Sequence, residues 1–563
     1  MWKVTQLFLR RTGGNFAIGA GVLAIPLIFA AGLMVDMTTV SRSQNELQQA
    51  MDAAVLAVAR EGERLTQKEA IEIARTYLEE NYDLVFGNLT VTRDGTKVTI
   101  DATAETPTAF GGLLGYSDWT VEARSTADIA FASYEVALVL DTTGSMAGGK
   151  LTAMKEAVDG MIESMSAQIK DKDRLKFSLV PFATFVNVGP EYGPKFDKNG
   201  AQIAGTGAKW LDLNGGSPVP QSELTPGVSR FQLYENLGKR WPGCVETRYR
   251  GGRNYDVDDT KADQKRPETL FVPAFSIDEP DTKEYVNSYV KSKVDIMDTS
   301  TKAKKQKWAK YGVATDRFGN PLNGGLLSGI LKGLGLGGDD DDEDDDEDDD
   351  DDRRSYKAKL KKKIEIDDSS SGYQDFKKGP DFGCGAQPIT PLSSDYDDIV
   401  RKVKRLRAQG NTNIMEGVSW GMRVLTPGEP FGEGKSIDDP RIEKIMVVLT
   451  DGANRFGVDR NPLGSKYSSN GYLVDERLGR LLPSNSSVTP AMNDRTLAAC
   501  NYAKELGIEI YTIRLEEPDK ATGNLLQQCA SSEGHFFDAP SRRQLDEVFE
   551  EIGKRVVKLR LAS

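Results

Sequence analysis

The strongest pattern near the N-terminus is a long run of apolar residues. Residues 16–35 read FAIGAGVLAIPLIFAAGLMV and contain no charged side chain. A helix of this length spans about 30 Å, the thickness of the hydrocarbon core of a bilayer. Lys3, Arg10 and Arg11 precede the run and Asp36 ends it, so the positive-inside rule places the N-terminus in the cytoplasm. Because cleaved signal peptides have shorter apolar segments of about 7–15 residues, we expect an uncleaved anchor over residues 1–36.

A helical repeat continues beyond the anchor and predicts one long helix to about residue 60. Leu47, Met51 and Val58 recur at the spacing of one helix face. The segment 66–82 predicts a second helix. Alternating apolar and polar residues predict strands at 89–105 and 119–131, with a turn at Asp94-Gly95. Together these elements predict a small pilin-like α+β module over residues 37–131.

From Tyr134 the pattern becomes that of an α/β domain. Val136–Leu140 is an unbroken apolar run, typical of a buried strand, and an amphipathic helix begins at about Lys150. Further strands are expected at 445–449, 508–515 and 535–539, and further helices at 497–507, 522–532 and 542–557. This alternation predicts a doubly wound, Rossmann-like and mostly parallel sheet, built from residues 132–189 and 388–563.

Residues 190–387 interrupt this pattern and predict a lobe inserted into the α/β domain. The segment is rich in turn residues, aromatic residues and arginine. Within it, Asp339–Asp352 are fourteen consecutive Asp or Glu residues, whose mutual repulsion prevents a packed core. We therefore expect disorder over residues 325–372. The acidic run is interpreted as a solvated tether, with weak Ca²⁺ binding or a basic partner as alternatives.

The charge balance excludes several functions. The formal net charge is −13, but it becomes +1 without the acidic run, so no broad basic surface for nucleic acid is expected.

His535 is the one histidine, which excludes a His-based triad, a zinc cluster or a haem site, and we expect it to be structural. The segment GEPFGEGKS has five residues between Gly428 and Gly434, where a P-loop has four. The sequence thus predicts a protein that is not an enzyme.

Oxygen-bearing side chains follow the first strand of the α/β domain. Asp141, Thr143 and Ser145 occupy alternate positions after the strand. They can all point to one side of an extended loop, and their oxygens suit Mg²⁺ or Mn²⁺ better than zinc. By itself the segment is more typical of a helix N-cap after a strand.

The D-x-T-x-S pattern of these residues resembles the D-x-S-x-S of the metal-ion-dependent adhesion site (MIDAS) of von Willebrand factor A (vWA) domains, with Thr143 in place of the middle serine. The resemblance implies two further metal residues, Thr412 after the helix that ends at Gly410, and Asp451 after an apolar strand. It also implies that an Asp or Glu of a protein partner completes the metal's coordination. The three loops occur in the order of that family and favour a metal site over a helix cap.

The N-terminal run RRTGGNFAIGAGVLAIPLIFAAGLMVDMTTVSRSQNELQQAMDAAVLAVA resembles the start of TadG-like proteins of Tad/Flp pilus-assembly systems. The segments W-x-G-C-V-E and L-F-V-P of the insertion also resemble TadG-like proteins that carry a vWA domain. Gly13-Gly14 suggests prepilin processing, but Gly19 stands where pilins have glutamate, so no cleavage is expected. The resemblance implies an inner-membrane protein whose bulk is periplasmic or extracellular.

The four cysteines allow three disulfide pairings. None forms a C-x-x-C pair, and an even number fits two disulfides outside the cytoplasm or four buried thiols inside it. We favour Cys244–Cys384, because these residues bracket the insertion. We also favour Cys500–Cys529, because they lie on successive predicted helices that flank one strand.

These observations predict an envelope-anchored protein that binds a protein partner through a divalent cation, in Tad/Flp pilus assembly or adhesion. The alternative is a structural scaffold of the pilus or secretion machinery, whose metal site has no function. A chelatase-like enzyme subunit is disfavoured by the anchor and by the lack of a P-loop.

Overall fold

The chain forms two compact units, residues 1–131 and residues 132–563. The computed structural model describes residues 12–61, 66–82, 85–94, 97–128, 133–169, 171–250, 253–290, 292–322, 378–439, 441–539 and 541–558. The acidic run Asp339–Asp352, and the whole segment 325–372 in which disorder is predicted, therefore lie outside the described residues.

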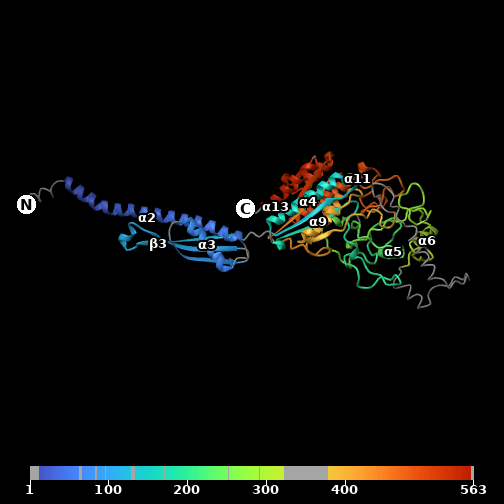
Figure 1. The fold of residues 1–563 in the computed structure, drawn as a ribbon, viewed down its shortest axis with the longest axis horizontal. Helices are drawn as coiled ribbons and strands as arrows, with labels where there is room; N and C mark the ends of the chain where they lie inside the picture. Colours follow the sequence, from blue (N-terminus) through green and yellow to red (C-terminus); the bar gives the residue numbers. More distant parts are fainter. Residues whose placement is uncertain are drawn as a thin grey trace, which may run out of the picture. The chain divides into compact units, whose positions relative to one another are not determined.

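The described residues of the first unit include two α-helices and a three-stranded antiparallel sheet (Figure 1). The helix predicted to continue past the apolar run does so, and α2 extends over Thr12–Glu61. A capping box at Thr66, whose hydroxyl accepts from the Glu69 N–H, begins α3 (Gln67–Asn81). The strands lie in the order β1 (Phe86–Asp94), β2 (Lys97–Pro107) and β3 (Asp118–Asp128). The segments predicted as strands thus pair in one sheet.

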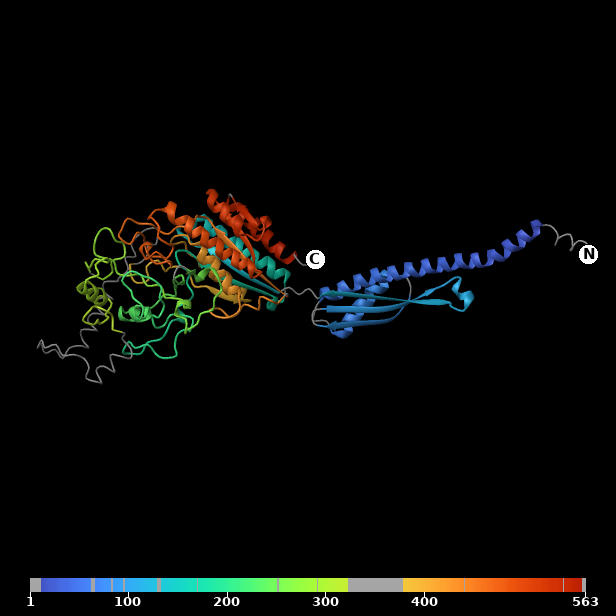
Figure 2. The same cartoon turned by 180° about the vertical axis from the view of Figure 1, so that it is seen from behind.

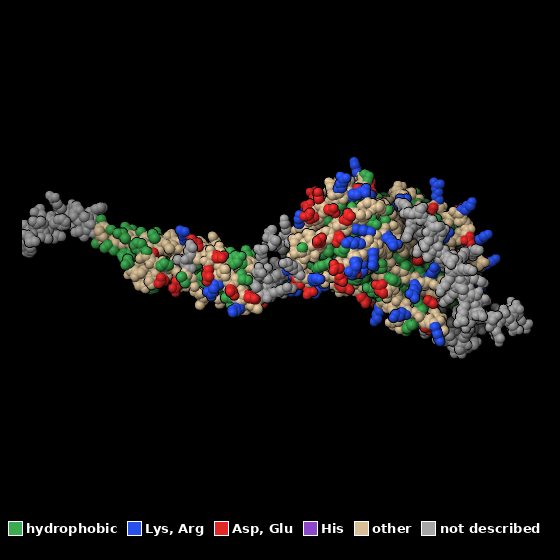
Figure 3. Space-filling view, in the orientation of Figure 1, with side chains coloured by type: hydrophobic (Ala, Val, Ile, Leu, Met, Phe, Trp, Pro, Cys, Tyr) green, Lys and Arg blue, Asp and Glu red, His purple; other side chains and the backbone are tan. Residues whose placement is uncertain are grey.

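The two halves of α2 have different surroundings. In the C-terminal half, Leu47, Met51 and Val58 are fully buried against the sheet and α3. In the N-terminal half the apolar side chains are exposed, among them Leu23 and Ile28 at 63% and 62%, and Figure 3 shows hydrophobic side chains gathered there. Within the described residues, α2 is the one helix long and apolar enough to cross a membrane. The exposed half is the part that a bilayer would cover.

The second unit contains a six-stranded sheet in the order β11-β10-β9-β4-β5-β8. The strands are β4 (Ser133–Asp141), β5 (Leu175–Phe182), β8 (Thr390–Ser393), β9 (Ile442–Thr450), β10 (Glu509–Leu515) and β11 (Phe536–Ala539). All neighbours are parallel except β5 and β8, which pair antiparallel. The predicted mostly parallel sheet is therefore present, but with an antiparallel edge strand that the short sequence TPLS did not indicate.

Helices cover both faces of this sheet. Alternate residues of β4 point to opposite faces, so Val136 and Leu138 pack with one group of helices and Ala137 and Val139 with the other. The first group is α4 (Gly149–Gln168), α9 (Tyr396–Lys404) and α13 (Leu545–Lys558), and Figures 1 and 2 show α4 beside α13. The second group is α10 (Ile414–Leu425), α11 (Asn485–Glu505) and α12 (Lys520–Cys529).

The helix predicted to end at Gly410 is α9, which ends at Lys404, and one further helix differs from the prediction for a physical reason. The helix predicted at 497–507 is the C-terminal part of α11, which begins at Asn485 because Val488 and Met492 pack in a small apolar cluster despite Pro490. In α10, Gly421 lies directly against β4, since a Cβ there would be 2.5 Å from Val139 Cγ2. Glycine thus permits α10 to approach the sheet closely at this position.

The insertion, predicted as a lobe on the sheet domain, contributes residues to the core of that domain. Its α-helices and strands in the described residues are α5 (Arg230–Asn236), α6 (Thr301–Ala309) and the pair β6 (Tyr249–Arg250) and β7 (Arg253–Asn254). Trp210 and Phe271 of the insertion belong to the same hydrophobic cluster as Trp420 of α10, and the rings of Phe271 and Trp420 lie 4.9 Å apart. The predicted lobe therefore shares the core of the sheet domain.

Both favoured disulfide pairs are present in the structure. Cys244 is bonded to Cys384, across 140 residues of sequence, and Cys500 of α11 is bonded to Cys529 of α12. At the same place, Asn187 donates from its side chain to the carbonyls of Pro242 (3.0 Å) and Ala386 (3.1 Å). The insertion is thus closed at its base, where it leaves and re-enters the sheet domain.

Candidate metal centre

The five predicted metal residues lie at one edge of the sheet. Asp141 is the last residue of β4, and Asp451 directly follows β9. These strands are parallel neighbours, with Leu140 opposite Leu449 in the register, so both carboxylates emerge at the carboxyl edge where open α/β sheets hold ligands. The remaining residues of the site come from the loop after β4 and from the loop that precedes α10.

A continuous chain of hydrogen bonds joins the five residues. The Asp141 Oδ1 atom accepts from the backbone N–H of Thr143 (2.7 Å), whose Oγ1 lies 3.1 Å from the Ser145 Oγ. Thr412 Oγ1 donates to Thr143 Oγ1 (3.3 Å), and Ser145 Oγ donates to Asp451 Oδ1 (2.6 Å). Residues from three separate loops are therefore brought together as the sequence indicated.

Two further residues belong to this constellation and were not predicted. Thr450 Oγ1 donates to the second oxygen of Asp141 (2.6 Å), and Lys150 Nζ lies 2.7 Å from Asp451 Oδ2. Lys150 is in the first turn of α4, where the positive end of the helix dipole disfavours a cation. An unfavourably placed lysine at the start of a helix is a sequence feature that could have identified Lys150 as part of the site.

Burial and charge make the pair of carboxylates electrostatically unfavourable by themselves. Asp141 is fully buried, and its pKa is raised to about 7, first because burial removes water and then because Asp451 repels its charge. The hydrogen bonds from Thr143 and Thr450 act in the opposite direction. Ser145 is exposed, so the site opens to solvent at this residue.

The side chains fit a hard divalent cation. Two carboxylates and three hydroxyls form an all-oxygen set, which is the chemistry that Mg²⁺ and Mn²⁺ prefer. In the described part of the chain, no group of three or more His, Cys, Asp or Glu side chains could hold a metal ion. A cation at Asp141 and Asp451 would therefore depend on the hydroxyls of Thr143, Ser145 and Thr412.

The loop before α10 is connected to the insertion. Asn413 donates to the Ser469 hydroxyl (3.0 Å), and the Ser469 carbonyl accepts from the N–H of Thr247 in the insertion (2.9 Å). The Thr247 hydroxyl donates to Glu416 of α10 (2.9 Å). Burial, followed by repulsion from Asp256, raises the pKa of Glu416 to about 7. The position of Thr412 is thus supported by insertion residues that no motif indicated.

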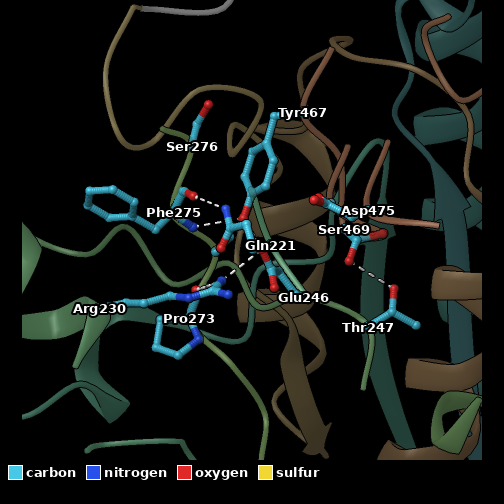
Figure 4. Close-up of polar contacts among 12 residues, drawn as sticks. Gln221, Arg230, Glu246, Thr247, Pro273, Phe275, Ser276, Tyr467, Ser469 and Asp475 are labelled. Atoms are coloured by element: carbon cyan, nitrogen blue, oxygen red, sulfur yellow. Dashed lines mark hydrogen bonds and ion pairs between the residues drawn. The ribbon is translucent and has the colours of Figure 1, made fainter. Parts of the chain in front are cut away.

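A buried ion network lies next to this connection (Figure 4). Glu246 is 1% exposed and its two oxygens pair with Arg230 Nη1 (2.7 Å) and Arg477 Nη2 (3.0 Å). The Tyr467 hydroxyl also donates to Glu246. Gln221 contributes a hydrogen bond to the Phe275 carbonyl (2.6 Å) in the same region. The network joins the insertion to the chain after β9, and Glu246 is the last residue of the W-x-G-C-V-E segment.

His535 has no role at this edge of the sheet. Its ring lies 4.4 Å from the Tyr511 ring and contacts the side chains of Ser532 and Glu509. These contacts are those of a packed structural residue, as the sequence predicted.

Several solved structures resemble the chain at low identity. The pilus adhesin SpaC from Lactobacillus rhamnosus GG has 10% identity and a TM-score of 0.31, covering 85% of this chain and 34% of that one. The vWF domain of the type V pili tip protein Mfa5 from Porphyromonas gingivalis has 9% identity and a TM-score of 0.31. The match covers 76% of this chain and 96% of that one. The PilB minor pilin from Streptococcus sanguinis has 12% identity and a TM-score of 0.27. The match covers 84% of this chain and 77% of that one. This chain thus spans about a third of the SpaC chain, and likenesses at these scores carry no argument about fold.

A family assignment is available for the N-terminal segment alone. No curated protein matches the chain. Residues 14–61 match the family described as putative Flp pilus-assembly TadE/G-like. The matched segment lies within α2 and includes the whole apolar run 16–35. The chain therefore carries a TadE/G-like Flp pilus-assembly segment at its N-terminus.

Proposed function

We propose that this protein is a single-pass protein of the inner membrane whose extracytoplasmic vWA domain binds a protein partner through Mg²⁺ or Mn²⁺. The role is in Tad/Flp pilus assembly or adhesion, and it is not enzymatic. One observation carries the proposal: two carboxylates and three hydroxyls from three loops converge at the ends of β4 and β9. The cation would be held by Asp141, Thr143, Ser145, Thr412 and Asp451.

The chemistry of the site favours partner binding over catalysis. A divalent cation held there would offset the repulsion between Asp141 and Asp451 and attract a carboxylate of the partner. Exposure of Ser145 gives such a side chain access to the site. The chain has one histidine, and it lies elsewhere, so the site lacks the usual general base.

The extracytoplasmic location is supported by two independent features. The apolar half of α2 is long enough to cross a membrane, and it belongs to the TadE/G-like segment. The two disulfides are typical of proteins that fold in an oxidising compartment.

The direct test is calorimetric titration of Mg²⁺ and Mn²⁺ into the unit from Ser133 onward. We expect Asp141→Ala to abolish binding, because it removes one of the two charges that hold the cation. Asp397→Ala, at an exposed aspartate in the first turn of α9, is the matched control and should bind like the parent. Deletion of residues 339–352 from every variant removes binding to the acidic run. Equal binding by the Asp141→Ala variant and its parent would exclude the metal site.

Lys150 provides a second prediction about the same site. Its ammonium pairs with Asp451 and repels a cation bound beside that carboxylate. We expect Lys150→Gln to tighten Mg²⁺ binding by about tenfold, which corresponds to about 1.4 kcal/mol. Lys520→Gln, in the first turn of α12, is the control and should leave the affinity unchanged. Weaker binding after Lys150→Gln would mean that the lysine positions Asp451 for the metal.

The Lys150–Asp451 ion pair also supports a second candidate, a scaffold of the pilus machinery that works without metal. In that case the ammonium permanently balances the charge of Asp451. Complementation of a deletion strain separates the two functions, since a scaffold would keep full pilus assembly and adhesion with Asp141→Ala, whereas a metal-dependent binder would lose one of them.

A further inference from the structure

The connection between β2 and β3 forms an apolar tip beside the exposed half of α2. The tip, Thr108–Trp119, consists of this connection and the first two residues of β3. It contains a short 3-10 turn (Gly111–Leu114) and is closed by a hydrogen bond from Thr108 N to the Ser117 carbonyl (2.9 Å). Figures 1 and 2 both show this end of the β2–β3 hairpin alongside α2, on the N-terminal side of the sheet.

Asp36 fixes the tip to the helix. Its carboxylate accepts hydrogen bonds from the backbone N–H groups of Ala109 (2.9 Å), Phe110 (2.9 Å) and Gly111 (2.7 Å). Only 4% of Asp36 is exposed, so the three bonds replace the water that the charge has lost. Because Asp36 directly follows the apolar run, the tip is held at the end of the membrane-length segment.

A contact between Gly32 and Phe110 extends the tip into that segment. A Cβ atom on Gly32 would lie 2.4 Å from the Phe110 ring, so the ring packs directly on the helix backbone. Gly32 is three residues inside the apolar run 16–35, a rise of about 4.5 Å along the helix. Part of the tip therefore lies at the depth where the hydrocarbon core of a bilayer would end.

The exposed side chains of the tip are of the kinds found where the hydrocarbon core of a bilayer meets its polar layer. Leu113, Tyr116 and Trp119 are 70%, 72% and 53% exposed, although the module has a packed core in which they could have been buried. Tyrosine and tryptophan are enriched at membrane–water interfaces, where a ring meets lipid and a polar group meets water. Asp118 is the one charged residue of the tip, and the Ser117 hydroxyl donates to it (2.7 Å).

We propose that the β2–β3 tip is a second membrane contact, with Leu113, Tyr116 and Trp119 inserted in the interfacial layer of the bilayer. The occupant of this surface is lipid and not a protein, because the surface is continuous with the apolar helix that the membrane would surround. The inference rests on the membrane anchor of the proposed function. Its consequence is that the sheet module is attached at two points, which fixes its tilt and the depth of α2.

The test uses the full-length chain in vesicles of phosphatidylethanolamine and phosphatidylglycerol. All four cysteines are in disulfides, so one introduced cysteine is the sole free thiol. Leu113→Cys is labelled with an environment-sensitive NBD probe and quenched by spin-labelled lipid or by aqueous iodide. Leu23→Cys reports on the anchor. Lys68→Cys is the water-exposed control, since Gln67 beside it bonds to Val91 at the opposite end of the sheet.

We expect spin-labelled lipid to quench the probes at positions 113 and 23 several-fold more than the probe at 68, and iodide to show the reverse order. Lipid quenching at 23 with iodide quenching at 113 would overturn the tip contact and leave the anchor intact. Protection of position 113 from both quenchers would show that protein covers the tip, which also overturns the proposal. Iodide quenching at 23 would overturn the anchor, and the tip contact with it.

Discussion

Replacing Cys244 and Cys384 together by serine is expected to lower the free energy of unfolding of the second unit by about 5 kcal/mol. The bond closes a loop of 140 residues, and without it the unfolded chain gains the conformational entropy of that loop. The same change should weaken Mg²⁺ binding, because Cys244 precedes the Val245–Thr247 segment that contacts Ser469 and Glu416. Urea unfolding of the unit from Ser133 onward measures the first effect.

The second disulfide is the matched control for this prediction. Cys500 and Cys529 are separated by 29 residues, so the double replacement by serine should cost less, about 3.6 kcal/mol by the same loop-entropy estimate. It should also leave Mg²⁺ affinity nearly unchanged, since α11 and α12 contribute no residue to the site. A larger loss from the shorter loop would contradict the loop-entropy account.

Glu246→Gln is expected to destabilise the second unit by roughly 3–5 kcal/mol, the usual cost of breaking a buried ion pair. The substitution leaves the guanidinium groups of Arg230 and Arg477 without their shared counter-charge in a site with almost no water. Thermal unfolding followed by circular dichroism measures the loss. Glu163→Gln on the exposed face of α4 is the control and should change stability by less than about 0.5 kcal/mol.

A triple variant tests whether the loss of stability in Glu246→Gln comes from unpaired buried charge. Replacing Arg230 and Arg477 by methionine and Glu246 by leucine removes all three charges together. If unpaired buried charge is the cause, this variant should be more stable than Glu246→Gln alone. A triple variant that is less stable would show that the ion pairs themselves contribute the stability.

Asp141, Thr143 and Ser145 could be singled out from their spacing after an apolar strand, whereas Thr412 and Asp451 were implied by the resemblance to vWA domains. An apolar strand that ends at an aspartate places the carboxylate at a sheet edge wherever the rest of the chain lies, which is true of both Asp141 and Asp451. Lys150 and Thr450 were missed because their importance lies in contacts across about 300 residues of sequence. The metal itself stays a prediction.

The insertion was only partly predictable for the same physical reason. Its aromatic residues indicated a folded lobe, but irregular segments have no periodicity to show which face they bury. The contact of Phe271 with Trp420, and of Thr247 with Glu416, depends on the path of the whole loop. The exposure of the tip residues Leu113, Tyr116 and Trp119 could not be predicted either, because they lie in or next to a turn between two predicted strands.

Because of the strand order, the six-stranded sheet can be completed only after the insertion has been synthesised. β4 and β5 follow one another closely, but their outer neighbours, β9 and β8, both come after the insertion. At about 5–20 residues per second, the roughly 200 residues between β5 and β8 take on the order of 10–40 s to emerge. During that interval the two-stranded nucleus has both edges open and is exposed to pairing with foreign strands. A chaperone that shields strand edges would therefore act on this protein before its insertion is complete.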